Sequence, residues 1–426
     1  MLVWTSIPLA LGGRVLAASG SVFLSIMLSR YYGLSALGVF TIMSTGATLA
    51  AIIAGGGYGT AFLREASRLN ATAERGHIAE LYRAVGRRLV VRLPLQFILC
   101  VAAGFLYSSL VRPLGVAAVL MLSLPVVFLP LITLSSEYFK AIKRAEISVL
   151  LNPGVAALLT GCFVLLTASV VASADATSPV RAYGAYVISC AVVCLLGWLL
   201  VRAVAKPAIR SSSLDIVRNE STIASSRADY FRAQLYTFFS FSGLFLVAGL
   251  SLDESQIGIV RLAERIAAPM ALALSVITPL IASDLAGTYA RGDIASVRRI
   301  VRRTGNVCLG FAVTFATAVI VYIDEIAAAS GVETAEVFVP VIVIMVGSAV
   351  NLACGPLGTV LNMTRHECDV KRISLITLCA SLVFTQMALL VAGIVGFSVA
   401  LAFSYCLKNA LMLVVYRRNF GKEQAK

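Results

Sequence analysis

The chain alternates long apolar stretches with short clusters of charged residues. Four of the stretches contain no Lys, Arg, Asp or Glu: residues 95–111, 115–135, 149–174 and 182–201. A helix rises 1.5 Å per residue, so roughly 20 apolar residues cross about 30 Å of hydrocarbon. Because several separate stretches approach or reach that length, a single membrane anchor does not explain them. The pattern predicts an all-α membrane protein that crosses the bilayer many times.

Charged loops divide the apolar stretches into about twelve transmembrane helices. They form two six-helix lobes, residues 1–205 and 229–426, joined by a polar cytoplasmic linker at residues 206–228. The predicted spans are residues 6–31, 37–60, 94–111, 115–136, 148–172, 182–201, 233–251, 256–283, 305–323, 337–361, 373–391 and 393–416.

The distribution of basic residues predicts the orientation. Of the 35 Lys and Arg residues, 28 fall in alternate loops and the C-terminal tail, whereas the opposite loops hold only Arg30, Arg112 and Arg181. Basic residues are retained on the cytoplasmic side during membrane insertion. The sequence therefore predicts that both termini are cytoplasmic (N-in/C-in).

The composition agrees with a membrane protein and argues against other classes of protein. Only 13% of residues are charged, against about 25% in soluble domains. The net charge of +14 is spread over all predicted cytoplasmic loops instead of one stripe, which argues against nucleic acid as a partner. Nine cysteines match no zinc or redox spacing, and neither a metal nor a cofactor is expected.

The two halves of the chain resemble each other. Residues 75–85 align with residues 291–301, with six of eleven positions identical at an offset of 216. Residues 37–40 (LGVF) similarly match residues 257–260 (IGIV), where the second span of each half begins. Two matches at equivalent positions indicate a duplication. Because each half has an even number of predicted spans, the repeat is parallel, which places a substrate path between the lobes.

Short motifs resemble those of the Wzx-type polysaccharide flippases, a branch of the multidrug/oligosaccharidyl-lipid/polysaccharide exporter superfamily (MATE-like transporters). The motifs lie after the first span, at the end of the second, in the eighth and in the last. They are residues 30–40 (RYYGLSALGVF), 56–65 (GGYGTAFLRE), 258–260 with Ala263 and Arg265, 279–283 (PLIAS), and 393–400 (GIVGFSVA).

The resemblance implies a function, partners and a location. Members of this family move an undecaprenyl-pyrophosphate-linked oligosaccharide across the bacterial inner membrane by alternating access, for surface polysaccharide biosynthesis. A glycan polymerase and a chain-length regulator are implied as partners, beside the lipid-linked oligosaccharide and the bilayer. The resemblance also implies a transporter and not an enzyme.

A few charged residues lie inside predicted spans, where an ion usually faces a cavity or a partner. Four are basic: Arg14, Arg261, Arg265 and Lys408. We expect them to line the transport path, since guanidinium groups bind phosphate oxygens in bidentate fashion. The opposing interpretation is that Arg261 extends to the membrane interface and that Glu264 only neutralises a neighbour. Glu264 and Asp229 are the acidic residues available for ion coupling or as charge partners.

Three alternatives to a flippase fit a polytopic membrane protein. A multidrug antiporter of the same superfamily would be expected to hold cationic drugs with deep carboxylates, but here deep basic residues outnumber deep acidic ones. A membrane glycan polymerase or glycosyltransferase usually carries a large outer loop or a catalytic domain. The longest outer loop predicted for this chain is short, roughly residues 324–336. A scaffolding relative without transport activity is a third alternative.

Overall fold

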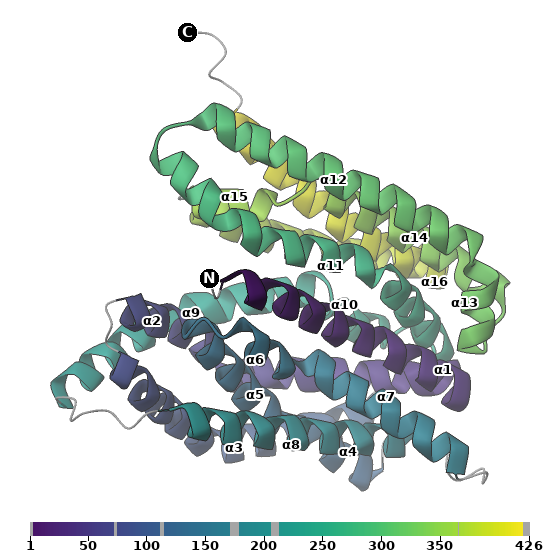
Figure 1. Ribbon diagram of the computed structural model, residues 1–426. Coiled ribbons are helices and arrows are strands. Elements are labelled where there is room, and N and C mark those ends of the chain that lie inside the picture. Colours follow the sequence, from purple (N-terminus) through teal and green to yellow (C-terminus); the bar gives the residue numbers. More distant parts are fainter. Residues whose placement is uncertain are drawn as a thin grey trace. The chain divides into compact units, whose positions relative to one another are not determined.

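The structure is a computed structural model that describes residues 3–71, 75–110, 115–170, 179–205, 213–364 and 366–420 (Figure 1). In these ranges every regular element is a helix. The predicted all-α class is therefore confirmed for the described residues.

Seven helical segments of the described chain are long and apolar enough to cross a membrane. A shorter apolar helix covers Pro153–Thr167. The seven segments are Ser19–Gly55, His77–Leu106, Val116–Ala141, Pro179–Val204, Ile294–Val321, Thr334–Asn362 and Cys368–Phe420.

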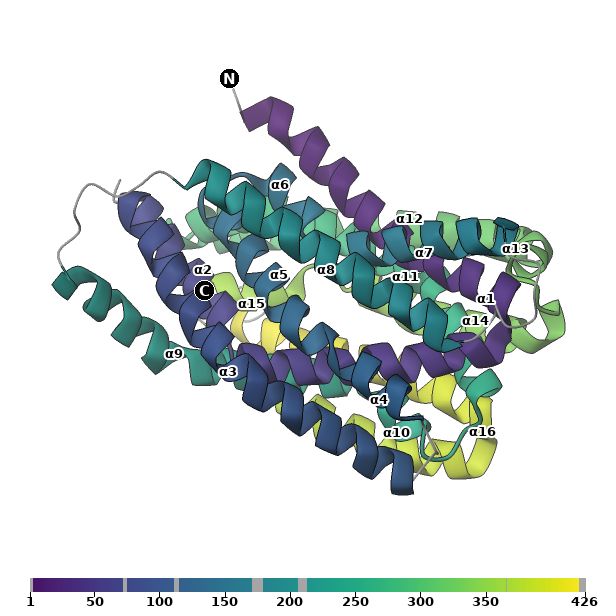
Figure 2. The same cartoon turned by 90° about the horizontal axis from the view of Figure 1, so that it is seen from below.

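Two of these segments lie in helices that are interrupted by a break. Helix α1 (Val3–Gly55) is broken at Gly33 (φ 84°, ψ 166°), and helix α16 (Glu367–Phe420) is broken at Ala392 and Gly393. Gly393 has φ 50° and ψ −123°, a backbone conformation essentially restricted to glycine. Figure 2 shows the second part of α1 running back from the break. The break in α16 lies where the sequence predicts the turn between the last two spans.

The described chain divides into two compact units. Unit 1 comprises residues 1–31 and 39–235. Its core element is α5 (Pro125–Ala141), which contacts α2, α3, α4, α6 and α8. The bounds of the remaining helices are α2 Tyr58–Ala71, α3 Arg75–Leu110, α4 Val116–Ser123, α6 Ala145–Leu150, α7 Pro153–Val170 and α8 Pro179–Val204.

Unit 2 comprises residues 32–38 and 236–426. Helix α14 (Thr334–Ala353) packs against α11, α12, α13 and α16, and α10 and α15 also contact α16. The bounds of these neighbouring helices are α10 Leu244–Ala248, α11 Glu254–Ala290, α12 Ile294–Val321, α13 Ile323–Ser330 and α15 Leu357–Met363.

Helix α9 (Ser213–Ser240) occupies most of the segment that was expected to be a linker. Residues 206–212 lie outside the described residues. The boundary between the compact units falls inside α9, between Leu235 and Tyr236. A helix therefore carries the chain from one unit into the other.

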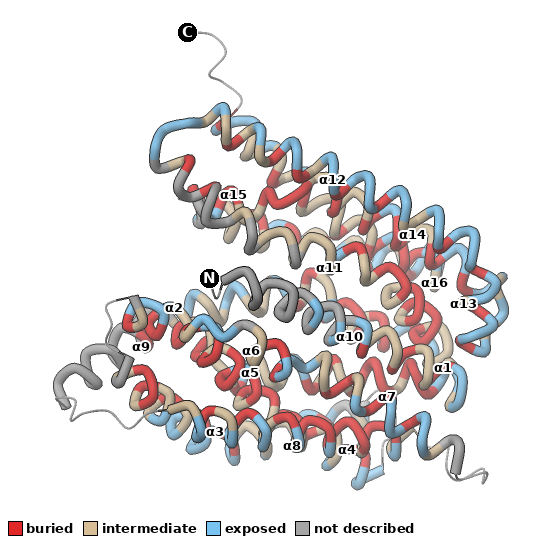
Figure 3. The backbone as a smooth tube through the Cα atoms, in the orientation of Figure 1, coloured by how far each residue is buried: buried red, intermediate tan, exposed pale blue. Residues whose placement is uncertain are grey.

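The outer surface carries large apolar side chains. Leu390, Val391 and Val91 have 82%, 84% and 73% of their surface exposed. Along the helices, buried and exposed segments alternate (Figure 3). Extensive exposed apolar surface marks contact with a membrane or with another protein. This distribution agrees with helices surrounded by lipid.

A cluster of basic and aromatic residues as candidate functional site

Three charged side chains meet on one face of α11. Arg261 donates from Nη1 to Glu264 Oε2 at 2.7 Å, and Arg265 Nε lies 3.9 Å from the same oxygen. The spacings of three and four residues place all three on neighbouring positions of one helix face. Their side chains are 13%, 24% and 23% exposed for Arg261, Glu264 and Arg265. We call these three residues the charge cluster.

An aromatic ring supports Arg261 on another side. The guanidinium carbon of Arg261 lies 5.1 Å from the ring centroid of Phe245 in α10. Phe245 in turn makes an edge contact with Phe397 of α16, with centroids 5.1 Å apart. A cation over an aromatic face is held by the negative potential of that face. Arg261 is therefore fixed by an acid and by a ring, and does not extend freely along an apolar surface.

A second basic residue, Lys408 of α16, is held in a similar way. Its Nζ lies 5.2 Å from the ring centroid of Phe241, in the turn between α9 and α10. Phe241 stacks on Tyr405 of α16 with centroids 4.7 Å apart. Tyr405 is in turn within electrostatic range of Glu264, Arg265 and Arg261. The aromatic pair thus connects Lys408 to the charge cluster.

The electrostatic balance of this region is positive. Among the described side chains of this region, Arg261, Arg265 and Lys408 are basic and Glu264 is acidic, and the Glu264 carboxylate lies against the two arginines. A guanidinium group presents its N–H donors in a planar fork. Such an arrangement suits a phosphate-type anion better than a cation.

The structure brings together four of the six residues singled out from the sequence, namely Arg261, Glu264, Arg265 and Lys408. All four lie in unit 2. Asp229 lies in α9 within unit 1 and pairs with Arg232 at 3.5 Å, with both side chains more than half exposed. Arg14 lies in α1, but its side chain is outside the described residues.

Sequence analysis missed the aromatic residues of this region. Phe241 and Phe245 are four residues apart, and Tyr405 precedes Lys408 by three. These spacings place each pair close together if the segment is helical. The three-residue spacing between Tyr405 and Lys408 within an apolar span could therefore have identified Tyr405 as part of the site. The turn at residues 241–243 gave no comparable signal for Phe241.

The repeated glycines occupy equivalent places in one helix crossing within unit 2. A Cβ on Gly38 would overlap the carbonyl oxygen of Glu254, and a Cβ on Gly258 would overlap that of Leu34. Each glycine thus meets the residue four positions before the other, as expected for a local two-fold relation. Ser35 also donates from Oγ to Glu254 Oε2 at 2.8 Å. The crossing lies at the start of α11, and its Gly258 is one turn before Arg261.

Comparison with known proteins gives a fold but no sequence relative. No protein-family model and no curated protein sequence matches the chain. Solved structures of membrane transporters, in contrast, have a similar fold. An inward-facing multidrug resistance transporter of the MATE family, in the MOP superfamily, has a TM-score of 0.70 and 11% identity, with 99% of this chain and 100% of that chain covered.

The lipid II flippase MurJ, in an inward closed conformation, has a TM-score of 0.72 and 11% identity, with 96% of this chain and 88% of that chain covered. A MATE protein in complex with MaL6 has a TM-score of 0.62 and 13% identity, with 98% and 96% covered. The predicted resemblance to the superfamily is therefore confirmed at the level of fold. The chain has the fold of the MOP-superfamily membrane transporters.

Proposed function

We propose that the protein is a transporter, not an enzyme, that moves an undecaprenyl-pyrophosphate-linked oligosaccharide across the bacterial inner membrane for surface polysaccharide biosynthesis. The observation that carries the proposal is the excess of fixed basic groups at the charge cluster and Lys408. The similar solved structures include both multidrug transporters and a flippase for lipid II. The sign of the charge in this region favours the flippase.

The arginines suit the pyrophosphate end of such a substrate. Guanidinium groups form paired, charge-assisted hydrogen bonds to phosphate oxygens. Glu264 accepts a hydrogen bond from Arg261 and lies 3.9 Å from Arg265, so both guanidinium groups are near the same carboxylate. In this proposal Arg261 and Arg265 bind the pyrophosphate, Lys408 adds positive charge, and Arg14 contributes from α1.

Transport by alternating access requires contacts that form in one state and separate in another. We propose that the protein works by alternating access. Twelve spans, two six-helix lobes and cytoplasmic termini are the arrangement in which this takes place.

Multidrug antiport is the alternative within the same fold. A cationic drug would need a carboxylate that is available to it, but Glu264 Oε2 already accepts from Arg261 and faces Arg265. Glu264 and Asp229 stay in the proposal as charge partners or coupling groups. A glycan polymerase and a chain-length regulator follow only from the resemblance, as enzymes that would act on the transported glycan.

The proposal is tested with purified protein in liposomes. A fluorescent undecaprenyl-pyrophosphate oligosaccharide is placed in both leaflets, and its transfer is followed by enzymatic trimming or quenching from one side. We expect protein-dependent transfer of this lipid and no protein-dependent uptake of a cationic dye. Dye transport by correctly inserted protein, without lipid transfer for several glycans, would move the assignment to a drug antiporter.

A further inference from the structure

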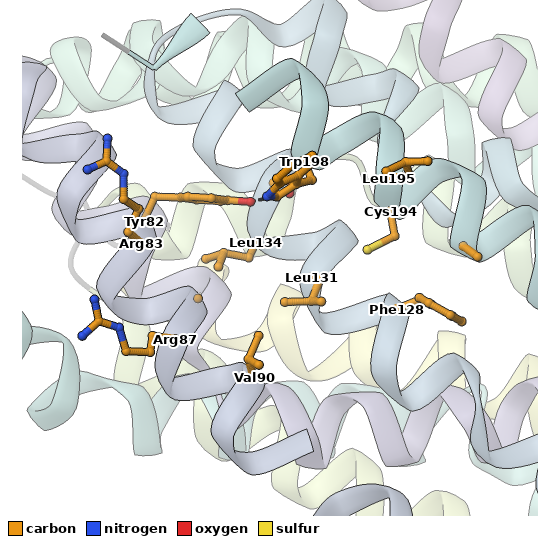
Figure 4. Close-up of a pocket in the computed structure, with 13 residues that line it drawn as sticks. Tyr82, Arg83, Arg87, Val90, Phe128, Leu131, Leu134, Cys194, Leu195 and Trp198 are labelled. Atoms are coloured by element: carbon orange, nitrogen blue, oxygen red, sulfur yellow. Dashed lines mark hydrogen bonds between the residues drawn. The ribbon is translucent and has the colours of Figure 1, made fainter. Parts of the chain in front are cut away.

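Unit 1 contains a groove of about 550 Å³ between α3, α5 and α8 (Figure 4). Its walls are mainly apolar, and several of the lining side chains, such as Val90, Leu195 and Trp198, are exposed on the protein surface. The apolar wall residues are Val90, Phe128, Leu131, Leu134, Ala191 and Leu195. The groove therefore opens to the medium that surrounds the helices.

One end of the groove is basic and aromatic. Arg83 and Arg87, one turn apart on α3, lie at this end, and Phe128 lies at the opposite end (Figure 4). Tyr82 is hydrogen-bonded through its hydroxyl to Ser135 Oγ at 2.9 Å. Within the described chain neither arginine forms a salt bridge. The guanidinium carbon of Arg202 lies over the Trp198 ring at 5.3 Å and adds a third basic group nearby.

We propose that this groove binds an anionic diacyl phospholipid. The apolar wall suits an acyl chain, because burial of hydrocarbon against hydrocarbon leaves no polar group unsatisfied. Arg83 and Arg87 are placed to bind the phosphate, and Trp198 and Tyr82 are residue types that favour the headgroup level. Basic pockets between helices at a membrane surface bind anionic headgroups in this way.

The site is distinct from the charge cluster. All the residues that line the groove belong to unit 1, whereas the charge cluster belongs to unit 2. Arg83 and Arg87 lie in the first part of α3, which the distribution of basic residues predicts to be on the cytoplasmic side, so the proposed lipid belongs to the inner leaflet. The proposal does not depend on which substrate the protein transports.

Native mass spectrometry of the full-length protein tests the proposal. The protein in detergent is titrated with phosphatidylglycerol and with phosphatidylcholine of the same acyl chains. We expect a preference for phosphatidylglycerol of about tenfold, and loss of most of it in R83Q/R87Q. The matched control is R299Q/R303Q, which removes two exposed arginines of the same spacing from α12 and should keep the preference.

A second variant tests the groove without changing its charge. In A191F, a larger side chain fills the apolar wall, so binding of both lipids should fall while the arginines remain. Equal binding of the two lipids by the wild type would overturn the proposal. Equal loss of the preference in R83Q/R87Q and in the control pair would also overturn it. So would full lipid binding by correctly folded A191F.

Discussion

Two pairs of arginines with the same spacing lie in different surroundings. Arg83 and Arg87 on α3 are exposed at the end of an apolar groove and form no salt bridge within the described chain. Arg261 and Arg265 on α11 are mostly buried and share the carboxylate of Glu264. Both pairs place two guanidinium groups on one helix face. The neighbouring residues, not the spacing, decide whether such a pair is fixed in place or available to bind a lipid headgroup.

The glycine near each pair also differs in its packing. Gly258 lies one turn before Arg261 and contacts the backbone of Leu34, whereas Gly86 lies between Arg83 and Arg87 and would gain only a 3.8 Å contact with Leu134. The buried pair is therefore carried by a helix whose position is fixed by backbone contact. The exposed pair lies on a helix face where a side chain added at Gly86 would meet only Leu134, at ordinary contact distance.

Substitution of these two glycines should give the largest difference between the two regions in the free energy of unfolding. G258A places a Cβ against the carbonyl oxygen of Leu34, and such overpacking should lower the free energy of unfolding by about 3 kcal/mol. G86A meets no backbone atom and should raise it by up to about 1 kcal/mol, because alanine favours the helix. Reversible unfolding in mixed micelles measures both. Equal effects would show that the crossing does not hold α11.

The coupling energy between an arginine and a nearby glutamate should differ between the two regions by a smaller amount. A double-mutant cycle of R261Q and E264Q should give a coupling energy of about 2 kcal/mol, because a charge-assisted hydrogen bond is lost from a mostly buried site. The matched cycle uses R83Q and E80Q, residues three apart on α3 with no salt bridge between them in the described structure. We expect its coupling energy to be near zero. A coupling for Arg83 and Glu80 as large as that for Arg261 and Glu264 would remove the distinction between the two pairs.

Loss of the contact between Arg261 and the Phe245 ring should have the smallest effect on stability. F245L removes the ring 5.1 Å from the guanidinium carbon but keeps an apolar side chain, and should lower stability by about 0.5–1 kcal/mol. In the R261Q background the same substitution should have a smaller effect, since the cation is absent. Thermal unfolding of the four proteins measures this. An unchanged effect in that background would mean that Phe245 acts only through packing.

Much of the fold followed from the chain's periodicity and its glycines. Long uncharged runs identified many of the helices, and Gly393 marked a break that the structure contains. The glycines at positions 38 and 258 were recognised as part of a repeat, but their crossing was not predicted. These signals are local, because an uncharged run or a repeated glycine can be recognised without knowing its partner. The helix across residues 213–228 was missed, because polar and charged residues there have the composition of a linker.

The site was only partly accessible from the sequence. Arg261, Glu264 and Arg265 could be placed on one face because they are close along one helix. The partners Phe241 and Phe245 come from other elements, and their contacts with Lys408 and Arg261 depend on how α10 and α16 pack. The groove in unit 1 was missed for the same reason. Its walls come from three helices, and its arginines looked like ordinary residues of a cytoplasmic loop.

The most direct test of the proposed function is lipid transfer in proteoliposomes by R261A/R265A, compared with wild type and with R83A/R87A. Loss of two phosphate-binding guanidinium groups should lower the transfer rate at least about tenfold. R83A/R87A should lower it less than about threefold, and R261K/R265K should restore part of the rate by restoring charge. Wild-type transfer by correctly inserted R261A/R265A would contradict the account, because the charge cluster would then have no part in substrate binding.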